Sequence, residues 1–267
     1  GKPELLLSGR MSEHKTSFSA AQISELGRAD LVFIVGHGLE AKLAQIGGSE
    51  AVGGKSFVEL SEVSGIKTLG VREGGGWEHD EHEEEADHND HAEGFLAFDP
   101  HVWLDPENAK VMAKAIAVEL AKADSANAAV YEANAKRLAS DIDAASADIS
   151  ASLASVKDKP FIVFHDAYQY FERSFGLRAV GSISDVSAAS PSAQRLKEIR
   201  GKLAATGAVC VFREPQFDSK FIDTVIEGSN ARPGVLDPLG ADLEAGPGAY
   251  SQLLHNLANN LKSCLEG

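Results

Sequence analysis

Three well-separated histidines are the residues of this chain best suited to bind a metal ion. His14 follows Glu13, His101 precedes a capped helix start, and His165 precedes Asp166. Zinc takes imidazole nitrogens and carboxylate oxygens in a four-coordinate shell, so three such histidines and one carboxylate are suitable donors. Each histidine taken singly is more often a hydrogen-bonded loop residue than a ligand, so a metal site requires a fold that brings them together.

A second group of histidines lies in the stretch 78–93, which holds four histidines, nine acidic residues and neither Lys nor Arg. Tracts of this composition cannot build a core, although they can bind metals. We therefore expect a solvated loop with a secondary role, either weak zinc capture or sensing of high zinc. Its histidines are His79, His82, His88 and His91.

The charge of the chain also favours a cation as ligand. The 267 residues carry a formal net charge of −15, and nine of the negative charges lie in the stretch 78–93. A nucleic-acid partner requires a basic face that neutralises phosphates, so we expect none. No apolar run approaches the roughly 20 residues of a membrane-spanning helix.

Alternating strand and helix patterns predict an α/β fold. The runs 31–35, 161–164 and 208–212 are continuous and apolar, as in strands that are buried on both faces. Weaker patterns predict a further strand at 4–7 and two more within 58–71. Helical patterns between these runs indicate parallel sheets covered by helices.

A long helix is predicted in the middle of the chain. Apolar residues step by three or four from Leu138 to Leu153, over a helix of about 25 residues where globular helices average about 11–12. We interpret it as a spine that joins two lobes. The predicted boundaries are 1–126 for the N-terminal lobe, 127–156 for the linking helix and 157–267 for the C-terminal lobe.

Ligands of open α/β sheets bind beyond the carboxyl ends of the strands. This rule selects the loops that hold His14, His165, Glu214 and Asp237, and wide sequence spacing between such ligands is expected. The residues alone therefore predict a two-lobed α/β protein with a divalent-metal site.

The two cysteines, Cys210 and Cys264, do not form a CxxC motif. Two buried thiols and a disulfide between the last helix and an interior strand are equally compatible with the sequence. A disulfide would require an oxidising compartment.

Five motifs together resemble a known family. They are Ser12–Phe18 (SEHKTSF), Asp99–Pro106 (DPHVWLDP), Phe164–Phe171 (FHDAYQYF), Phe212–Phe217 (FREPQF) and Leu236–Gly240 (LDPLG). In this order they resemble the zinc-binding periplasmic solute-binding proteins of bacterial ABC importers, the ZnuA type within the cluster A-I metal-binding proteins. DPHVWLDP and FHDAYQYF are the most specific, and a His/acid loop just before DPHVWLDP is a further mark of the zinc-binding members.

The resemblance implies two α/β lobes with parallel sheets, joined by a long rigid helix, and a zinc ion in the interlobe cleft. His14, His101 and His165 fall on the three histidine ligands of the family. Relatives begin with a strand and a helix ahead of the residues present here, so the first βα unit of the N-terminal lobe is expected to be missing.

The resemblance also implies the surroundings of the metal. The fourth ligand would be Glu13 or a water, with Asp237 as the alternative carboxylate. Glu214 would hold a ligand or the lobe interface. Cys210 and Cys264 fall where zinc-binding members have a disulfide, which implies a periplasmic location.

The implied function is a monomeric, non-enzymatic receptor that delivers Zn²⁺ to the membrane permease of an ABC importer. A manganese or iron receptor of the same fold is one alternative, although a histidine at position 165 favours zinc over manganese. A zinc metallohydrolase is an alternative from another class, and the lack of an HExxH pattern counts against it.

Overall fold

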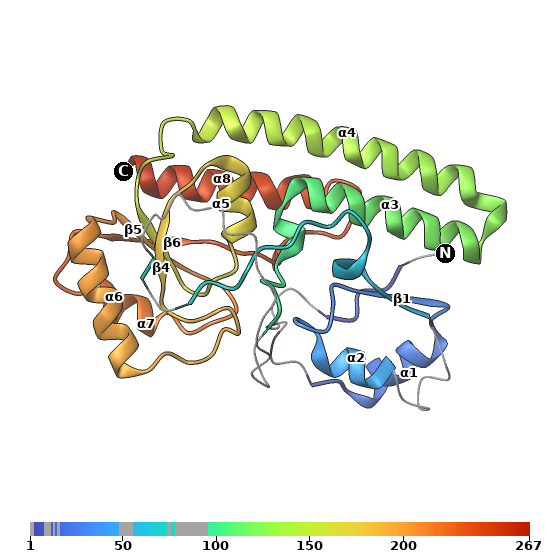
Figure 1. The fold of residues 1–267 in the computed structure, drawn as a ribbon, viewed down its shortest axis with the longest axis horizontal. Coiled ribbons are helices and arrows are strands. Elements are labelled where there is room, and N and C mark those ends of the chain that lie inside the picture. Colours follow the sequence, from blue (N-terminus) through green and yellow to red (C-terminus); the bar gives the residue numbers. More distant parts are fainter. Residues whose placement is uncertain are drawn as a thin grey trace. The chain divides into compact units, whose positions relative to one another are not determined.

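The computed structural model describes residues 3–7, 12, 14, 17–47, 56–73, 76–77 and 96–267. The chain divides by internal contacts into two compact units. Unit 1 comprises Gly1–Lys67, Pro100–Asp148 and Leu239–Leu254; unit 2 comprises Thr68–Asp99, Ile149–Pro238 and His255–Gly267. Figure 1 labels the main elements. Both units are discontinuous in sequence, and the three-part linear division at 126/127 and 156/157 stays a prediction.

Unit 1 contains a two-stranded parallel sheet and the helices that cover it. Strand β1 (Leu31–Ile34) pairs in parallel with β2 (Ser56–Glu59). Helix α1 (Ala20–Arg28) begins with the expected capping box, and α2 (Ala41–Gly47) follows β1. Apolar residues of α1, β1 and α2 form a small core, because each element turns one apolar face inward. The buried members of that core are Leu26, Val32, Ile34 and Leu43.

Two strands that the sequence predicted in this unit are not formed. Residues 4–7 have no strand pairing, and Leu5 is 78% exposed. Leu6 and Leu7 instead pack on the edge of the small core, and the side-chain amide of Gln22 donates to the Leu6 carbonyl. The second run within 58–71 is also wrong, because after β2 the chain enters the 3₁₀ turn η3 (Leu60–Glu62) and then continues without regular structure to residue 73.

Helix α3 (Pro106–Ala123) begins as the sequence predicts. The Asp105 carboxylate caps it by accepting from the backbone N–H groups of Glu107 and Asn108, and Pro106 occupies the first turn. The short turn η4 (Val102–Leu104) precedes the helix, and η5 (Ser125–Asn127) follows it. The region around His101 is therefore fixed by a well-capped helix start.

The predicted long helix is confirmed as α4 (Ala128–Leu153), which has 26 residues. The apolar stripe is its buried face, since Ile142, Ala145, Ile149 and Leu153 are each at most 3% exposed. The helix residues up to Asp148 belong to unit 1, and those from Ile149 onward belong to unit 2.

Unit 2 contains a four-stranded parallel sheet with the strand order β4-β3-β5-β6. The strands are β3 (Phe161–Val163), β4 (Ala179–Ser182), β5 (Cys210–Arg213) and β6 (Arg232–Val235). The helices between them are α5 (Gln169–Phe175), α6 (Ala193–Thr206) and α7 (Lys220–Ile226). Together with unit 1, this sheet confirms the mixed α/β class with parallel sheets.

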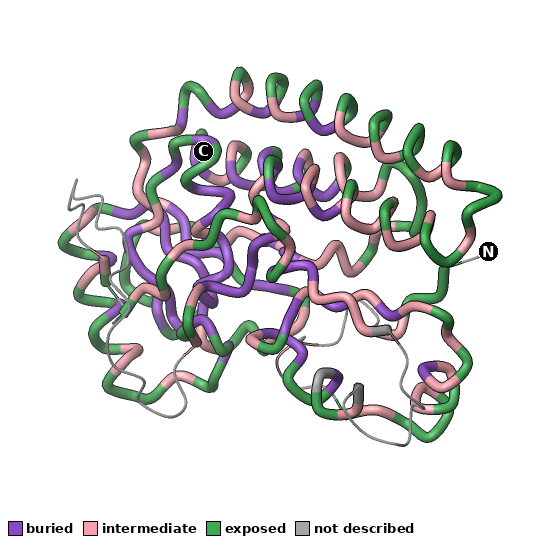
Figure 2. The backbone as a smooth tube through the Cα atoms, turned by 45° about the vertical axis from the view of Figure 1, so that its right-hand side comes forward, coloured by how far each residue is buried: buried purple, intermediate pink, exposed green. Residues whose placement is uncertain are grey.

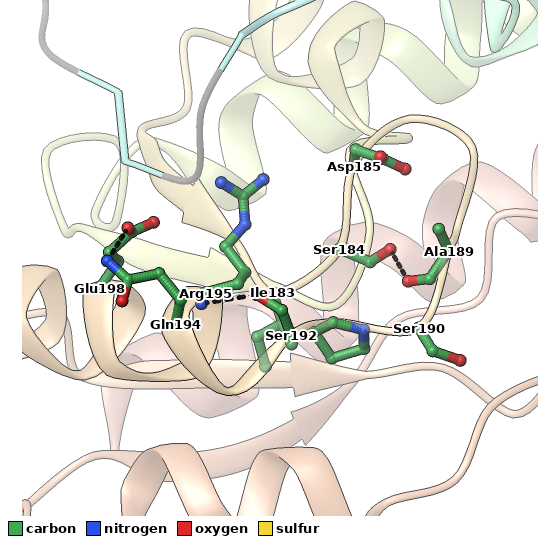
Figure 3. A pocket seen from close by; sticks show the side chains of 10 residues that line it. Ile183, Ser184, Asp185, Ala189, Ser190, Ser192, Gln194, Arg195 and Glu198 are labelled. Carbon is green, nitrogen blue, oxygen red and sulfur yellow. Dashed lines mark hydrogen bonds between the residues drawn. The ribbon is translucent and has the colours of Figure 1, made fainter.

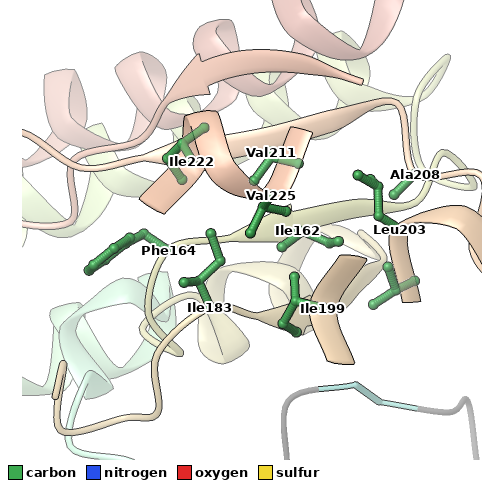
Figure 4. Packing of buried hydrophobic residues seen from close by; sticks show 10 residues of the cluster. Ile162, Phe164, Ile183, Ile199, Leu203, Ala208, Val211, Ile222 and Val225 are labelled. Carbon is green, nitrogen blue, oxygen red and sulfur yellow. The ribbon is translucent and has the colours of Figure 1, made fainter. Parts of the chain in front are cut away.

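The core of unit 2 lies between this sheet and two of its helices. Ile162 and Val211 from the strands meet side chains of α6 and α7, such as Ile199 and Val225 (Figure 4). Strand β3 is wholly buried, and β4 and β5 are buried at all but one residue each; buried residues are purple in Figure 2. Strands buried in this way carry continuous apolar runs and offer polar side chains only where they end.

The last helix, α8 (Ala249–Glu266), is covalently tied to the sheet. Cys264 on α8 and Cys210 on β5 form a disulfide, with an S–S distance of 2.03 Å. The bridge confirms the pairing that the family resemblance implied. None of the helices in the described part of the chain is both long and apolar enough to cross a membrane.

Candidate metal centre

His165 lies just beyond the carboxyl end of β3. Strand β3 is completely buried, and the chain leaves it through Phe164, whose carbonyl accepts from the Ser184 N–H at 2.7 Å. The His165 side chain is itself fully buried. A polar side chain at the end of a buried parallel strand is in the position where α/β proteins bind ligands.

Glu214 fixes the orientation of the His165 ring. It follows β5, which pairs with β3, so both residues lie at the same edge of the sheet. The Glu214 Oε1 atom accepts from Nδ1 of His165 at 2.7 Å and from its backbone N–H at 3.3 Å. Because Nδ1 donates its proton to a carboxylate, the lone pair of Nε2 remains available for a metal ion.

His101 is fully buried in unit 1 and lies directly before η4. Its carbonyl accepts from the Leu104 N–H at 3.1 Å. The Asn108 side chain donates to the Val102 carbonyl at 3.2 Å and also bonds to both backbone groups of Lys67. These contacts fix the backbone turn that carries His101 relative to the start of α3.

His14 is partly buried and lies beside His101, with ring centroids 5.4 Å apart and planes inclined at 63°. Trp103 also packs against His101, at 5.3 Å between ring centroids. Glu13, the predicted fourth ligand, lies outside the described residues.

Each of the three separated histidines offers one ring nitrogen, and these atoms all lie within 4.8 Å of one another. In a tetrahedral shell with zinc–nitrogen bonds of about 2.0–2.1 Å the donors lie about 3.3–3.4 Å apart, so small side-chain shifts suffice to bring these nitrogens onto one ion. Within the described part of the chain, this is the one group of three or more His, Cys, Asp or Glu residues with such spacing. Its members are His14, His101 and His165.

Asp237, the alternative carboxylate ligand, is not a member of that group. It follows β6 and Leu236, and the side-chain amide of Gln216 donates to its Oδ1 atom at 2.9 Å. The histidines His79, His82, His88 and His91 lie outside the described residues.

A buried ionic cluster next to His165 was not predicted from the sequence. Arg72 pairs with Asp166 and Glu172, which are 2% and 7% exposed. Burial raises the pKa of Asp166 to about 6, although Arg72 opposes that shift, so the carboxylate is ionised at neutral pH. Burial alone would lower the pKa of Arg72, but the two carboxylates raise it above its ordinary value.

Two pockets lie away from the histidines. A polar pocket of about 290 Å³ in unit 2 lies at the start of α6, lined by residues such as Ser184, Ser192 and Glu198 (Figure 3). An apolar pocket of about 380 Å³ in unit 1 is lined mainly by α3 and α4. Neither pocket is lined by a histidine; the polar pocket has the carboxylates of Asp185 and Glu198, and the apolar pocket has none.

Comparisons with known proteins agree with the metal chemistry of these residues. A family model described as ZnuA, zinc-uptake complex component A, periplasmic, matches residues 1–264. The high-affinity zinc uptake system protein ZnuA of Brucella abortus (strain 2308) is 43% identical over 99% of this chain and 85% of its own length. The protein of the same name from Yersinia pestis is 35% identical, over 98% of this chain and 84% of its own length.

Solved structures show the same architecture. A crystal structure of ZnuA superimposes with a TM-score of 0.79 at 27% identity, covering 98% of this chain and 90% of the other. The periplasmic zinc-binding protein TroA from Treponema pallidum, at 22% identity, shares the fold with a TM-score of 0.78 over 96% of this chain and 88% of its own. The family match along nearly the whole chain and the two relatives above 30% identity lead to one conclusion: this chain belongs to the ZnuA family of zinc-uptake proteins.

Proposed function

We propose that this protein is a high-affinity zinc receptor that binds Zn²⁺ through His14, His101 and His165. The observation that carries the proposal is the spacing of their ring nitrogens, within 4.8 Å of one another. Support comes from the Glu214 carboxylate, which presents Nε2 of His165 as a ligand. The names of the relatives, high-affinity zinc uptake system proteins, are consistent with this cargo.

Zinc titration against a chromophoric chelator tests the ligand set. His101→Ala and His165→Ala should each abolish tight binding, because two imidazoles and a water hold zinc much less firmly than three imidazoles. His37→Ala is the matched control, since this side chain is 69% exposed and pairs with Glu59. Unchanged tight binding in either ligand variant would refute the assignment.

The fourth ligand is proposed to be Glu13, with a water or Asp237 as alternatives. Glu13 directly precedes the proposed ligand His14 in the sequence, whereas Asp237 already accepts a hydrogen bond from Gln216. Glu13→Gln should weaken zinc binding more than Asp237→Asn does. The reverse order would assign the fourth place to Asp237, and equal small effects would assign it to water.

Zinc is proposed as the cargo in preference to manganese or iron. Three imidazoles make a soft nitrogen site that suits zinc, whereas manganese prefers oxygen ligands. Competition between Zn²⁺ and Mn²⁺ for the same site measures the preference. Stronger binding of manganese would overturn the choice of cargo while leaving the site in place.

The protein is proposed to act as a monomer in the periplasm, without catalysis, and to pass zinc to the membrane permease of an ABC importer. The Cys210–Cys264 disulfide supports an oxidising compartment. Sedimentation at equilibrium should give the mass of one chain. No zinc-dependent hydrolysis of ester or peptide substrates is expected, and hydrolysis that chelation abolishes would revive the metallohydrolase alternative.

A further inference from the structure

We infer that Arg72 is a positioning residue for the metal ligand His165, acting through Asp166; this inference rests on the proposed zinc site. The Nε atom of Arg72 donates to both Asp166 oxygens, at 3.1 and 3.0 Å, and Nη2 makes a further short contact with Oδ1. Asp166 is covalently adjacent to His165, so the position of its carboxylate restrains the backbone of the ligand.

Two contacts therefore position His165, one at its ring and one at the residue that follows it. Glu214 holds the ring at Nδ1, and Arg72 holds the following residue. The chain turns tightly at Asp166, because the Ala167 N–H donates to the His165 carbonyl at 2.9 Å. A change at either anchor alters where Nε2 lies, and metal ligands must be placed to within a fraction of an ångström.

Arg72 is itself held rigidly, although it lies in a segment without regular structure. Its Nη1 and Nη2 atoms donate to Glu172 at 3.1 and 2.9 Å. Its guanidinium stacks 3.6 Å from the centre of the Trp77 ring. The backbone N–H of Trp77 in turn donates to the Val180 carbonyl at 3.0 Å, so the backbone that carries the ring is tied to β4.

The backbone that precedes Arg72 is also hydrogen-bonded to other parts of unit 2. The Leu69 N–H donates to the hydroxyl of Tyr170, and that hydroxyl donates to the Asp99 carbonyl. The Asp99 N–H donates back to the Leu69 carbonyl at 2.8 Å. The guanidinium therefore approaches Asp166 from a fixed direction.

The chemistry at this position specifies arginine. A planar guanidinium can pair with two carboxylates and stack on an indole at the same time, whereas a lysine ammonium is a single point charge. Arg72→Lys keeps the positive charge but loses the planar guanidinium that pairs with two carboxylates, and Arg72→Gln loses both. Zinc affinity should therefore fall in the order wild type, Arg72→Lys, Arg72→Gln. The loss for Arg72→Gln should be about 10- to 100-fold, as for other partners of metal ligands.

The experiment measures zinc affinity by chelator competition and, separately, the visible absorption spectrum of the Co²⁺-loaded protein, which reports ligand geometry. Arg200→Gln is the matched control, because Arg200 lies in the same unit and pairs with Glu227 instead of the carboxylates around Arg72. Leu203→Ala, a core truncation in the same unit, controls for a general loss of stability. Urea denaturation of each metal-free protein ranks their stabilities.

The expected result is weaker zinc binding and an altered cobalt spectrum in Arg72→Gln and Asp166→Asn, with both properties near wild type in Arg200→Gln and Leu203→Ala. The double variant Arg72→Gln/Asp166→Asn should bind zinc about as tightly as Arg72→Gln alone, since both changes break one contact.

Two results would overturn the inference. One is a wild-type affinity and spectrum in Arg72→Gln; the other is an equal loss of affinity in a control variant of equal stability. Failure of the proposed zinc site is a separate outcome, because it would appear as tight binding retained in His165→Ala.

Discussion

The Glu214 carboxylate accepts a 2.7 Å hydrogen bond from Nδ1 of His165, and each side chain is at most 1% exposed. A buried carboxylate in this position selects the tautomer with the proton on Nδ1 and makes the ring a better metal ligand. Strand pairing brings the two residues together, since they follow the neighbouring strands β3 and β5.

Glu214→Ala is expected to weaken zinc binding by about 10- to 100-fold, because the His165 ring loses its orienting partner. Glu214→Gln should lose less, since the amide oxygen can still accept from Nδ1. Chelator competition gives both affinities. Wild-type affinity in Glu214→Ala would contradict a role for this carboxylate at the metal.

Removal of the Cys210–Cys264 disulfide is expected to lower the free energy of unfolding by about 2–4 kcal/mol, since the bridge closes a long loop in the unfolded chain. The bridged residues are 54 positions apart. Urea denaturation of metal-free Cys210→Ala/Cys264→Ala measures the change. Reductant should destabilise the wild type and leave the variant unaffected; equal stability of wild type and variant would show that the bridge contributes nothing.

Deletion of residues 78–93 is expected to reduce the number of zinc ions bound and to leave one tight site. The deleted stretch supplies His79, His82, His88 and His91, whereas the proposed ligands lie elsewhere in the chain. Isothermal titration calorimetry separates the two classes of site, with a Gly/Ser segment of equal length as control. Loss of the tight site in both proteins would make the loop the primary site.

A pH-dependent effect on stability is expected from Glu40 in unit 1. Burial raises the pKa of its carboxyl, with nearby Glu59 adding to the shift and the N–H groups of Gly36 and Val35 opposing it. The folded state therefore binds this proton more tightly than the unfolded state. The resulting stabilisation is complete below the unfolded pKa and is lost as the pH rises through the folded pKa.

Glu40→Gln removes that titration. The free energy of unfolding of Glu40→Gln minus that of wild type should therefore increase as the pH rises from about 4 to about 7. Urea denaturation of the two metal-free proteins across this range gives the difference. A pH-independent difference would show that Glu40 has an ordinary pKa in the folded protein.

The elements with a strong periodic pattern were predicted correctly from the sequence. The stripe from Leu138 to Leu153 lies on α4, the apolar run at 161–164 contains β3, and the run at 208–212 overlaps all but the last residue of β5. These patterns are reliable because burial repeats at the period of the element itself. The apolar run at 4–7 failed because a short apolar segment can pack on a core without pairing as a strand.

The proposed ligand histidines were predicted from motifs, whereas the cluster around Arg72 was not predicted. Arg72 and Asp166 are 94 positions apart, and no local pattern links an arginine in an irregular segment to a carboxylate after a strand. A buried ion pair of this kind follows from the tertiary fold, so only the structure reveals it.

The strand order β4-β3-β5-β6 has a consequence for how such proteins diversify. His165, Glu214 and Asp237 each stand one or two residues beyond β3, β5 and β6, which are neighbours in the sheet. None of the three residues takes part in the strand pairing, so a substitution at these positions can change the donor atoms offered at this edge while the hydrogen-bonded ladder of the sheet stays intact.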